Sequence, residues 1–554
     1  MRITFVALGW ERLGISLLSA IAKHHGNMVD LAFSPSLFND RYNLKAPFLA
    51  SFFDDRKEVI ASIRRQRPDV LVFSPLTGTY QWTLSIAKEA KMILPFVKTI
   101  FGGAHVSAVP DRVISQPQVD YVCVGEGDVA FPAILRAISE GGGTAPIINT
   151  RYKLADGEVV KGVQAGFIED LDALPVFDKT LWEDHICIGD WYLTMASRGC
   201  PYRCAFCFNS YFAQLPDEKA GKYVRRRSVK HMMRELHMAK RRYKLRFLEF
   251  EDDVFTMDKK WLKEFLDWYK KEIDVPFQCL THPRYMDEDI ARWLSEAGCR
   301  YVQMGIQSMD DEFKCREIHR YERSEHIYRA MEVMRKYKIR AKVDHMFGLP
   351  GESMKAQEDA RKLYIQHPPY RIQTFWTNFL PGTELVKRGL EVGLITPDEV
   401  KRLNEGLDFD FYRDSEKGMS PQKRKKYKAY EALFKLIPVL PGPLRRTIGP
   451  GFFERLPVPV CSLISFAADA VIGLATGNPD HWIYARHYIY HMVRFCLKKI
   501  GITMPPATRV IETRIPLPLR EGIGEGDFRT CHPYLTSLSA GRLHKGGGEN
   551  LRRC

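Results

Sequence analysis

Residues 197–209 read Ser-Arg-Gly-Cys-Pro-Tyr-Arg-Cys-Ala-Phe-Cys-Phe-Asn, and this stretch decides how the rest of the chain is interpreted. It places Cys200, Cys204 and Cys207 at positions i, i+4 and i+7. Structural zinc is usually held by four ligands, whereas three thiolates on one tight loop leave one iron of a cubane iron–sulfur cluster without a protein ligand. The spacing therefore favours a 4Fe–4S cluster. The alternatives are three incidental cysteines, or a zinc site completed by a distant ligand such as Cys187.

The composition is that of a folded protein with several domains. The chain has 554 residues, of which 45% are hydrophobic, and a formal net charge of +15. This length predicts about three domains. The positive charge favours an acidic partner without choosing among nucleic acid, anionic lipid headgroups and phosphorylated substrates. Twelve cysteines, scattered apart from the one group, indicate a reducing compartment, so we expect a cytoplasmic protein.

The first 144 residues have the pattern of a doubly wound parallel sheet. Short apolar runs alternate with helical periodicity; the runs are Ile3–Leu8, Val70–Ser74, Lys98–Phe101 and Tyr121–Val124. Turns rich in glycine and hydroxyl groups follow these runs, at the edge where open α/β sheets bind ligands. We therefore expect a flavodoxin-like domain over residues 1–144 and a linker with a small hairpin over 145–190. The alternative is such a fold without a ligand.

Residues 191–390 again alternate strand and helix patterns, which predicts a partial (β/α)6 barrel. The first strand, 192–196, leads into the cysteine loop, and the next, 247–255, contains Asp252 and Asp253. Carboxylates gathered at the end of a strand repel one another unless a cationic or hydroxylated group lies between them. A solvated turn that caps the following helix is the alternative interpretation. Further strands are expected at 277–281, 301–306, 342–347 and 375–379.

The cysteine loop resembles that of the radical S-adenosylmethionine (SAM) superfamily, because Phe206 stands before the last of the three cysteines. The resemblance implies a 4Fe–4S cluster on Cys200, Cys204 and Cys207, with SAM bound to the open iron and cleaved reductively to a 5′-deoxyadenosyl radical. It also implies that Phe206 packs on the adenine of SAM.

Other segments of the barrel resemble the same superfamily. Residues 305–308, Gly-Ile-Gln-Ser, are similar to its Gly-x-Glu-Ser element, with an amide in place of the carboxylate. Gln307 can still form hydrogen bonds but carries no charge. The residue that stands near the SAM carboxylate in relatives would be Arg284. The resemblance implies that SAM is held by Asp252, Asp253, Gln307 and Ser308.

The N-terminal residues resemble the cobalamin-binding domain found before many radical SAM barrels. The family's Ser-x-Leu element and Gly-Gly pair, which flank the cobalamin tail, would be Ser74, Leu76, Gly102 and Gly103. The family's Asp-x-His-x-x-Gly motif, whose histidine would ligate cobalt, is absent, and Glu11 stands at the position of that histidine. We therefore expect bound cobalamin without this ligand.

Residues 391–506 are expected to form a mainly helical domain, and residues 507–554 a disordered tail rich in Gly, Arg and Pro. The apolar stretch 456–476 contains Pro457 and Asp469, which argue against a membrane-spanning helix. A buried helix and a membrane-surface helix are the interpretations that remain.

The resemblance implies an enzyme, a cobalamin-dependent radical SAM methyltransferase, and the apolar C-terminal region favours an unactivated carbon of a hydrophobic or lipid-like substrate. One alternative is an oxidative cyclase or rearrangement enzyme that uses cobalamin without methyl transfer, as in the anaerobic magnesium-protoporphyrin ester cyclase. A second alternative is a non-catalytic cobalamin or redox sensor.

The expected partners are the substrate and a reductant such as flavodoxin or ferredoxin. No helix-turn-helix, RNA-recognition or zinc-finger pattern occurs, so no specific nucleic acid is expected. From the apolar and basic C-terminal region we also expect peripheral contact with a membrane.

Overall fold

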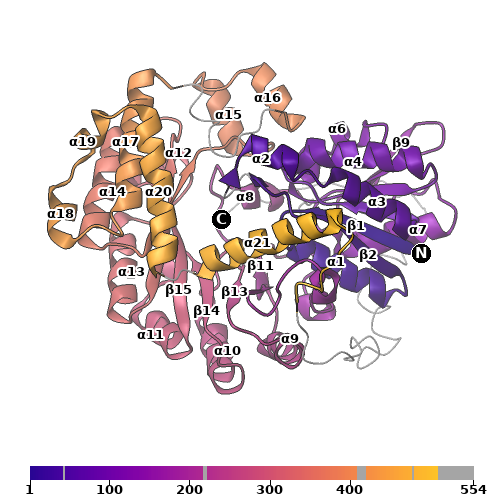
Figure 1. Cartoon of the computed structure of the whole chain (residues 1–554), viewed down its shortest axis with the longest axis horizontal. Coiled ribbons are helices and arrows are strands. Elements are labelled where there is room, and N and C mark those ends of the chain that lie inside the picture. The colour runs from indigo at the N-terminus through magenta and orange to yellow at the C-terminus, as the bar shows by residue number, and fades with distance from the viewer. Residues whose placement is uncertain (41–43, 216–220, 408–418, 477–478, 509–554) are drawn as a thin grey trace, which may run out of the picture. The chain divides into compact units, whose positions relative to one another are not determined.

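Figure 1 shows the computed structural model of the chain, which describes residues 1–40, 44–215, 221–407, 419–476 and 479–508. The predicted α/β architecture is confirmed. An N-terminal sheet that is mostly parallel is followed by a second, fully parallel sheet and then by a group of helices.

The N-terminal sheet has, within the described residues, seven strands in the order β2-β1-β5-β6-β7-β8-β9. The first five are parallel, and their order is that of flavodoxin-like folds. β5 is an unbroken run of buried apolar residues, as expected of a parallel strand covered on both faces. The strands are β1 (Arg2–Leu8), β2 (Met28–Ser34), β5 (Val70–Phe73), β6 (Lys98–Phe101) and β7 (Tyr121–Cys123).

Helices cover both faces of this sheet. α1 (Leu13–His24) and α7 (Gly127–Ser139) share one hydrophobic core with β1. α3 (Arg56–Gln66) and α4 (Tyr80–Ile93) share a second core on the opposite face. The doubly wound arrangement follows from the alternation of buried strand and half-buried helix along the chain.

The expected hairpin is present and extends the sheet. β8 (Thr150–Lys153) pairs antiparallel with β7, and β9 (Val159–Lys161) pairs antiparallel with β8. Gly157 occupies the turn with a φ of +90°, a conformation that glycine adopts readily.

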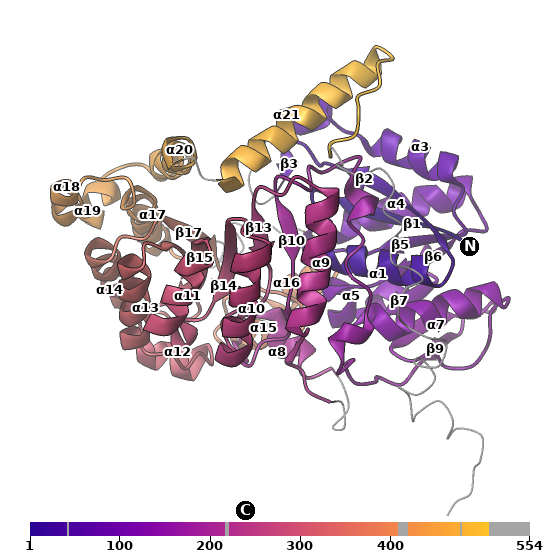
Figure 2. The same ribbon diagram turned by 90° about the horizontal axis from the view of Figure 1, so that it is seen from below.

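The second sheet is the predicted partial barrel. Its described strands follow the order β10-β13-β14-β15-β16-β17, and every neighbouring pair is parallel. Figure 2 shows α9, α10, α11, α13 and α14 packed outside the strands. The strands are β10 (Tyr192–Thr194), β13 (Leu248–Phe250), β14 (Phe277–Thr281), β15 (Cys299–Gln307), β16 (Arg340–Phe347) and β17 (Arg371–Trp376). The helices are α9 (Val229–Arg242), α10 (Lys259–Glu272), α11 (Glu288–Glu296), α13 (Ser324–Lys336) and α14 (Met354–Gln366).

Elsewhere the strand boundaries shift by no more than two residues, and two strands differ more from the expectation. The strand expected over 247–255 ends at Phe250, and the chain then turns, so Asp252 and Asp253 follow the strand. The strand expected over 375–379 begins instead at Arg371, because residues 371–376 alternate between half-buried and buried positions while the residues after Trp376 leave the sheet.

The C-terminal region is helical, as predicted. Its helices are α15 (Glu384–Glu391), α16 (Pro397–Asn404), α17 (Pro421–Leu436), α18 (Gly442–Thr447), α19 (Pro450–Glu454), α20 (Val458–Thr476) and α21 (Pro479–Lys499). The interpretation of 456–476 as a buried helix is wrong for one side of α20, which is exposed at Leu463 and Phe466. Among the described residues, no helix is long and apolar enough to cross a membrane. The predicted disordered tail lies, from residue 509 onward, outside the described residues.

Candidate active site

The cysteine loop begins at a short two-stranded ribbon. β11 (Ser197–Arg198) follows β10 and pairs antiparallel with β12 (Arg225–Arg226). Gly199 leaves the ribbon with a φ of +84°, and a Cβ at this position would lie 2.4 Å from the carbonyl oxygen of Tyr223. Only glycine therefore fits where the loop leaves β11.

The three cysteines lie along one loop, in which a turn joins Cys204 and Cys207. Cys204 is buried, and Cys200 and Cys207 are partly buried. The amide of Cys207 donates to the carbonyl of Cys204 at 2.9 Å. Burial raises the pKa of the Cys200 thiol to about 12 and that of Cys207 to about 11. These thiols are protonated without a metal, and coordination to iron would remove their protons.

Arg320 is a residue of this site that the sequence analysis missed. Its guanidinium is buried, lies close enough to Cys204 for its charge to act on the thiol, and donates to the carbonyl of Gly305 at 2.6 Å. It also donates to Glu322 at 2.6 Å. Burial by itself would raise the pKa of Glu322, but the charge of Arg320 lowers it to about 2. No motif marks this pair in the sequence, since only the fold brings residues 320–322 to the loop.

The two aspartates after β13 have different surroundings. Asp252 is fully buried and accepts hydrogen bonds from the amide of Ala196, at 2.9 Å, and from the hydroxyl of Ser197. It therefore holds the segment that carries the cysteine loop. Asp253 is exposed and accepts from Nδ2 of Asn209 at 2.7 Å, just beyond Cys207. Of the two, Asp253 is the carboxylate placed to reach a ligand.

The barrel residues predicted to hold SAM lie at the ends of neighbouring strands. Gln307 ends β15 at a register shift with a φ of +62°, and within the described chain its buried Oε1 has no hydrogen-bond partner. Ser308 follows it and is buried. Phe206 is partly buried and packs against clusters that contain Phe379 and Leu349. Arg284 is exposed on the short helix Pro283–Tyr285.

The residues predicted to line cobalamin meet at the carboxyl ends of β5 and β6. Gly103 has a φ of +90°, and a Cβ there would lie 2.7 Å from the Ser74 hydroxyl. The amide of Gly102 donates to the carbonyl of Phe73 at 2.9 Å. Leu76 is half-buried in the loop after β5. The backbone at Gly103 thus packs closely on the Ser74 hydroxyl, so the turn at the carboxyl end of β6 accepts glycine and excludes larger residues.

Glu11, at the position of the missing histidine, has a structural partner. It forms a buried ion pair with Lys179 and accepts from the Ser16 hydroxyl at 3.1 Å. Lys179 also donates to the carbonyl of Leu193, in β10, at 2.6 Å. Glu11 therefore ties the first turn of the N-terminal sheet to the first strand of the barrel.

Arginines of the cysteine-loop ribbon also join the two sheets. Arg198 donates to Asp128 at 3.2 Å, and Arg225 donates to Glu126 at 2.7 and 2.9 Å. Tyr211, in the helix that follows the loop, donates to the carbonyl of Ser107 at 2.9 Å. The cysteine loop is therefore held against the loops at the ligand-binding edge of the N-terminal sheet.

The side chains and turns described above fit a 4Fe–4S cluster, SAM and cobalamin. Three thiols on one loop suit a 4Fe–4S cluster with an open iron. The Oε1 of Gln307, which has no hydrogen-bond partner among the described residues, can accept a hydrogen bond from SAM. The turns after β5 and β6, which carry Ser74, Gly102 and Gly103, lie at the sheet edge where open α/β folds bind ligands, and this suits the tail of cobalamin.

Comparison with known proteins agrees with these observations. Residues 195–363 match the radical SAM superfamily and residues 3–135 match the B12 binding domain. The chain is 26% identical, over 67% of its length and 80% of the relative, to an uncharacterized methyltransferase of Pyrococcus horikoshii. It is 23% identical, over 65% of its length and 62% of the relative, to the anaerobic magnesium-protoporphyrin IX monomethyl ester cyclase of Rubrivivax gelatinosus.

Among solved structures, the fold is similar to that of the cobalamin-dependent S-adenosylmethionine radical enzyme OxsB. The TM-score is 0.59 at 13% sequence identity, and the alignment covers 91% of this chain and 81% of OxsB. At this identity the likeness shows a shared fold.

Proposed function

We propose that this chain, a member of the radical SAM superfamily that carries a B12 binding domain, methylates an unactivated carbon of a hydrophobic, lipid-like substrate. The radical SAM domain binds a 4Fe–4S cluster and SAM, and the B12 binding domain binds cobalamin. When bound, these groups supply a 5′-deoxyadenosyl radical and a methyl group.

The protein's own residues hold and orient these groups. Cys200, Cys204 and Cys207 would ligate the cluster, and Arg320 would offset the negative charge of the thiolates from its buried position. Gln307 would hydrogen-bond SAM. Hydrogen abstraction by a radical needs no acid or base from the protein, so positioning is the main task of these residues.

Further residues complete the two binding regions. Asp253 and Ser308 would contact SAM, Phe206 would pack on its adenine, and Arg284 would lie near its carboxylate. Ser74, Leu76, Gly102 and Gly103 would line the cobalamin tail.

The observation that carries the proposal is the connection between the cysteine loop and the N-terminal sheet. Arg198 pairs with Asp128 and Arg225 pairs with Glu126, so each end of the cluster-bearing segment is fixed to the loop after β7 or to the first turn of α7. A radical source and a methyl donor must act on one substrate carbon, and this requires their sites to be held at a fixed separation. These ion pairs provide that constraint.

The lipid-like substrate is supported by the C-terminal helices. Leu463 and Phe466 on α20 and Trp482 and Ile489 on α21 are exposed, so the region after the barrel offers apolar surface that a polar substrate would not need. A reductant such as flavodoxin or ferredoxin would supply the electron for SAM cleavage.

The test is an anaerobic assay of the reconstituted protein with cobalamin, a reductant, methyl-labelled SAM and a lipid extract. The expected result is label in the organic phase, with S-adenosylhomocysteine and 5′-deoxyadenosine formed together. Cys204→Ala should abolish both products, while Cys315→Ala, at an exposed cysteine outside the loop, should retain them.

Each other outcome has a definite meaning. 5′-Deoxyadenosine without S-adenosylhomocysteine or transferred label would overturn methyl transfer and favour the cyclase or rearrangement alternative. Absence of both products at full iron and cobalt content would overturn the enzymatic proposal and favour the sensor. Label only in water-soluble acceptors would overturn the lipid-like substrate alone.

A further inference from the structure

α20 is apolar on two sides. One side, which includes Cys461, Ala468 and Ile472, is buried. Asp469 pairs with Lys435 of α17 at 2.7 Å, so the helix is fixed to its neighbour by this side. The other side is exposed and carries Val460, Leu463, Phe466 and Val471, with Leu463 65% and Phe466 59% exposed. An exposed apolar stripe of this kind along a helix indicates a surface that a partner or a membrane covers when the protein functions.

α21 repeats this arrangement. Its inner side carries His487 and His491, which are buried near Phe33 of the N-terminal sheet. Its outer side is apolar at the helical spacing that places residues on one face. The exposed residues of this face are Trp482, Ala485, Ile489, Val493, Cys496 and Ile500.

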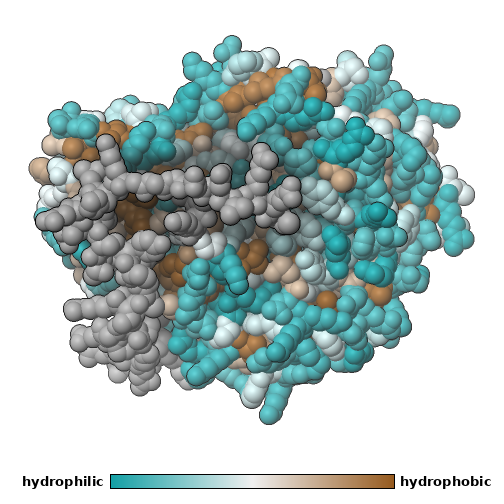
Figure 3. Space-filling view, turned by 180° about the vertical axis from the view of Figure 1, so that it is seen from behind, coloured by the Kyte–Doolittle hydropathy of each residue, from teal (hydrophilic) through white to brown (hydrophobic). Residues whose placement is uncertain are grey.

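The two stripes belong to one surface. α20 and α21 meet where a Cβ at Gly473 would come within 2.5 Å of the His481 ring. Figures 1 and 2 agree that α18, α19, α20 and α21 lie along one side of the molecule, the side facing the viewer in Figure 1. Phe452 on α19 and Leu444 on α18 are also exposed. Figure 3 shows the reverse side, where the surface that is not grey is predominantly hydrophilic.

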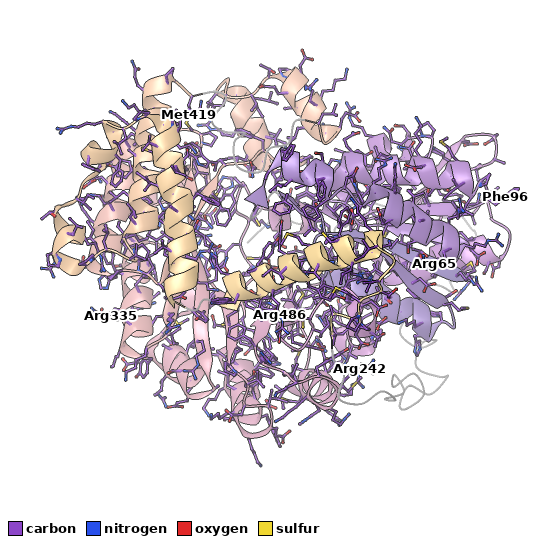
Figure 4. All side chains as sticks on the ribbon, viewed as in Figure 1. Arg65, Phe96, Arg242, Arg335, Met419 and Arg486 are labelled. Carbon is purple, nitrogen blue, oxygen red and sulfur yellow. The ribbon has the colours of Figure 1, made fainter. Side chains whose placement is uncertain are left out.

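The charged residues of the segment that carries this surface are mostly basic. Among the described side chains of residues 442–508, the acidic ones are Glu454, which is half-buried, and Asp469, which is paired. Arg486, labelled in Figure 4, projects from α21 and pairs with Asp190 of the linker. The basic residues of the segment are Arg445, Arg446, Arg455, Arg486, Arg494, Lys498 and Lys499.

We propose that the outer faces of α20 and α21 dock on an anionic membrane surface, with the helices lying in the plane of the interface. Aromatic and aliphatic side chains beside Lys and Arg are the pattern of interfacial helices. A second copy of the chain is a poorer occupant, because two identical surfaces of this kind would bring cations against cations. This docking does not depend on methyl transfer, although it would place the enzyme where a lipid-like substrate resides.

The test is co-sedimentation of the reconstituted protein with vesicles. The protein is expected to bind vesicles that contain phosphatidylglycerol, to bind pure phosphatidylcholine weakly, and to be released by salt. Leu463→Glu combined with Phe466→Glu should lower the apparent affinity about ten-fold or more, because the new carboxylates would have to enter the apolar part of the interface. The matched control is Met92→Glu combined with Phe96→Glu.

The control pair is as exposed as the test pair but lies elsewhere. Met92 and Phe96 are 74% and 93% exposed, and Figure 4 shows Phe96 at the opposite edge from α20. A second test pair, Ile489→Glu with Val493→Glu, probes α21 separately. Iron content and circular dichroism establish that each variant is folded.

Three results would overturn the proposal. They are no binding of the parent protein to anionic vesicles, equal loss of binding in the control pair, and unchanged binding in both test pairs. Light scattering without vesicles tests whether a second copy of the chain covers this surface. If the parent protein does not bind vesicles but forms a dimer, and Leu463→Glu combined with Phe466→Glu makes it monomeric, the surface is a dimer interface. Vesicle binding requires no turnover, so its failure and a failure of methyl transfer are distinguishable.

Discussion

At Gly199, a single added methyl group should force the cysteine loop away from Tyr223 and the β11–β12 ribbon. A Cβ at residue 199 would lie 2.4 Å from the backbone oxygen of Tyr223 and 3.0 Å from the Tyr223 ring, and φ is +84°. A backbone oxygen held next to the β11–β12 ribbon cannot rotate away. Gly199→Ala therefore forces the ribbon to open or the loop to adopt another path.

The magnitude has two parts. Placing alanine in the left-handed region costs about 1–2 kcal/mol. Opening the ribbon removes one or two backbone hydrogen bonds at about 0.5–1.5 kcal/mol each. The free energy of unfolding should therefore fall by about 3 kcal/mol. The cysteines move with the loop, so bound iron should fall as well.

The measurements are urea unfolding and the iron and sulfide content after anaerobic reconstitution. The control is Gly298→Ala, because Gly298 also has a positive φ, +94°, but a Cβ there meets nothing within 4 Å. Gly298→Ala should lose only the stability that the left-handed backbone costs, and its iron content should equal that of the parent protein. If the two variants lose equal stability and Gly199→Ala binds iron like the parent protein, the argument from the close contact is wrong.

Three further predictions follow from the same structure. Gly103→Ala should lower cobalamin affinity about ten-fold or more, because its Cβ would lie 2.7 Å from the Ser74 hydroxyl, and the iron content should stay unchanged. The control is Gly26→Ala, which has a φ of +76° but nothing within 4 Å of its Cβ, and it should leave the cobalt content at the parent value. Glu322→Gln should cost about 3–5 kcal/mol of unfolding free energy, since it leaves the buried Arg320 charge uncompensated; a loss below ~1 kcal/mol would contradict this. Burial lowers the pKa of His491 to about 4, so the stability that depends on its neutral form is present above about pH 6.5 and is lost as the pH falls toward 4. Hydrogen exchange in α21, corrected for intrinsic rates, should therefore be faster at pH 5 than at pH 7, and equal protection would refute it.

The sequence by itself determined the local chemistry. The spacing of Cys200, Cys204 and Cys207 is a property of thirteen consecutive residues, and this spacing by itself indicates the kind of metal site. The two α/β sheets were also predictable, because alternating apolar strands and amphipathic helices can bury their faces in few ways. The hairpin at Gly157 was readable from its turn residues.

Only the tertiary structure decided which groups surround that loop. Arg320 and Glu322 reach Cys204 from more than a hundred residues along the chain, and Asp252 proves to hold the loop's backbone. Such contacts depend on which strand ends lie side by side in the fold, and local sequence patterns do not predict this. The same holds for α20: the sequence left a buried helix and a membrane-surface helix open, and the structure places α17 on one side and leaves Leu463 and Phe466 exposed on the other.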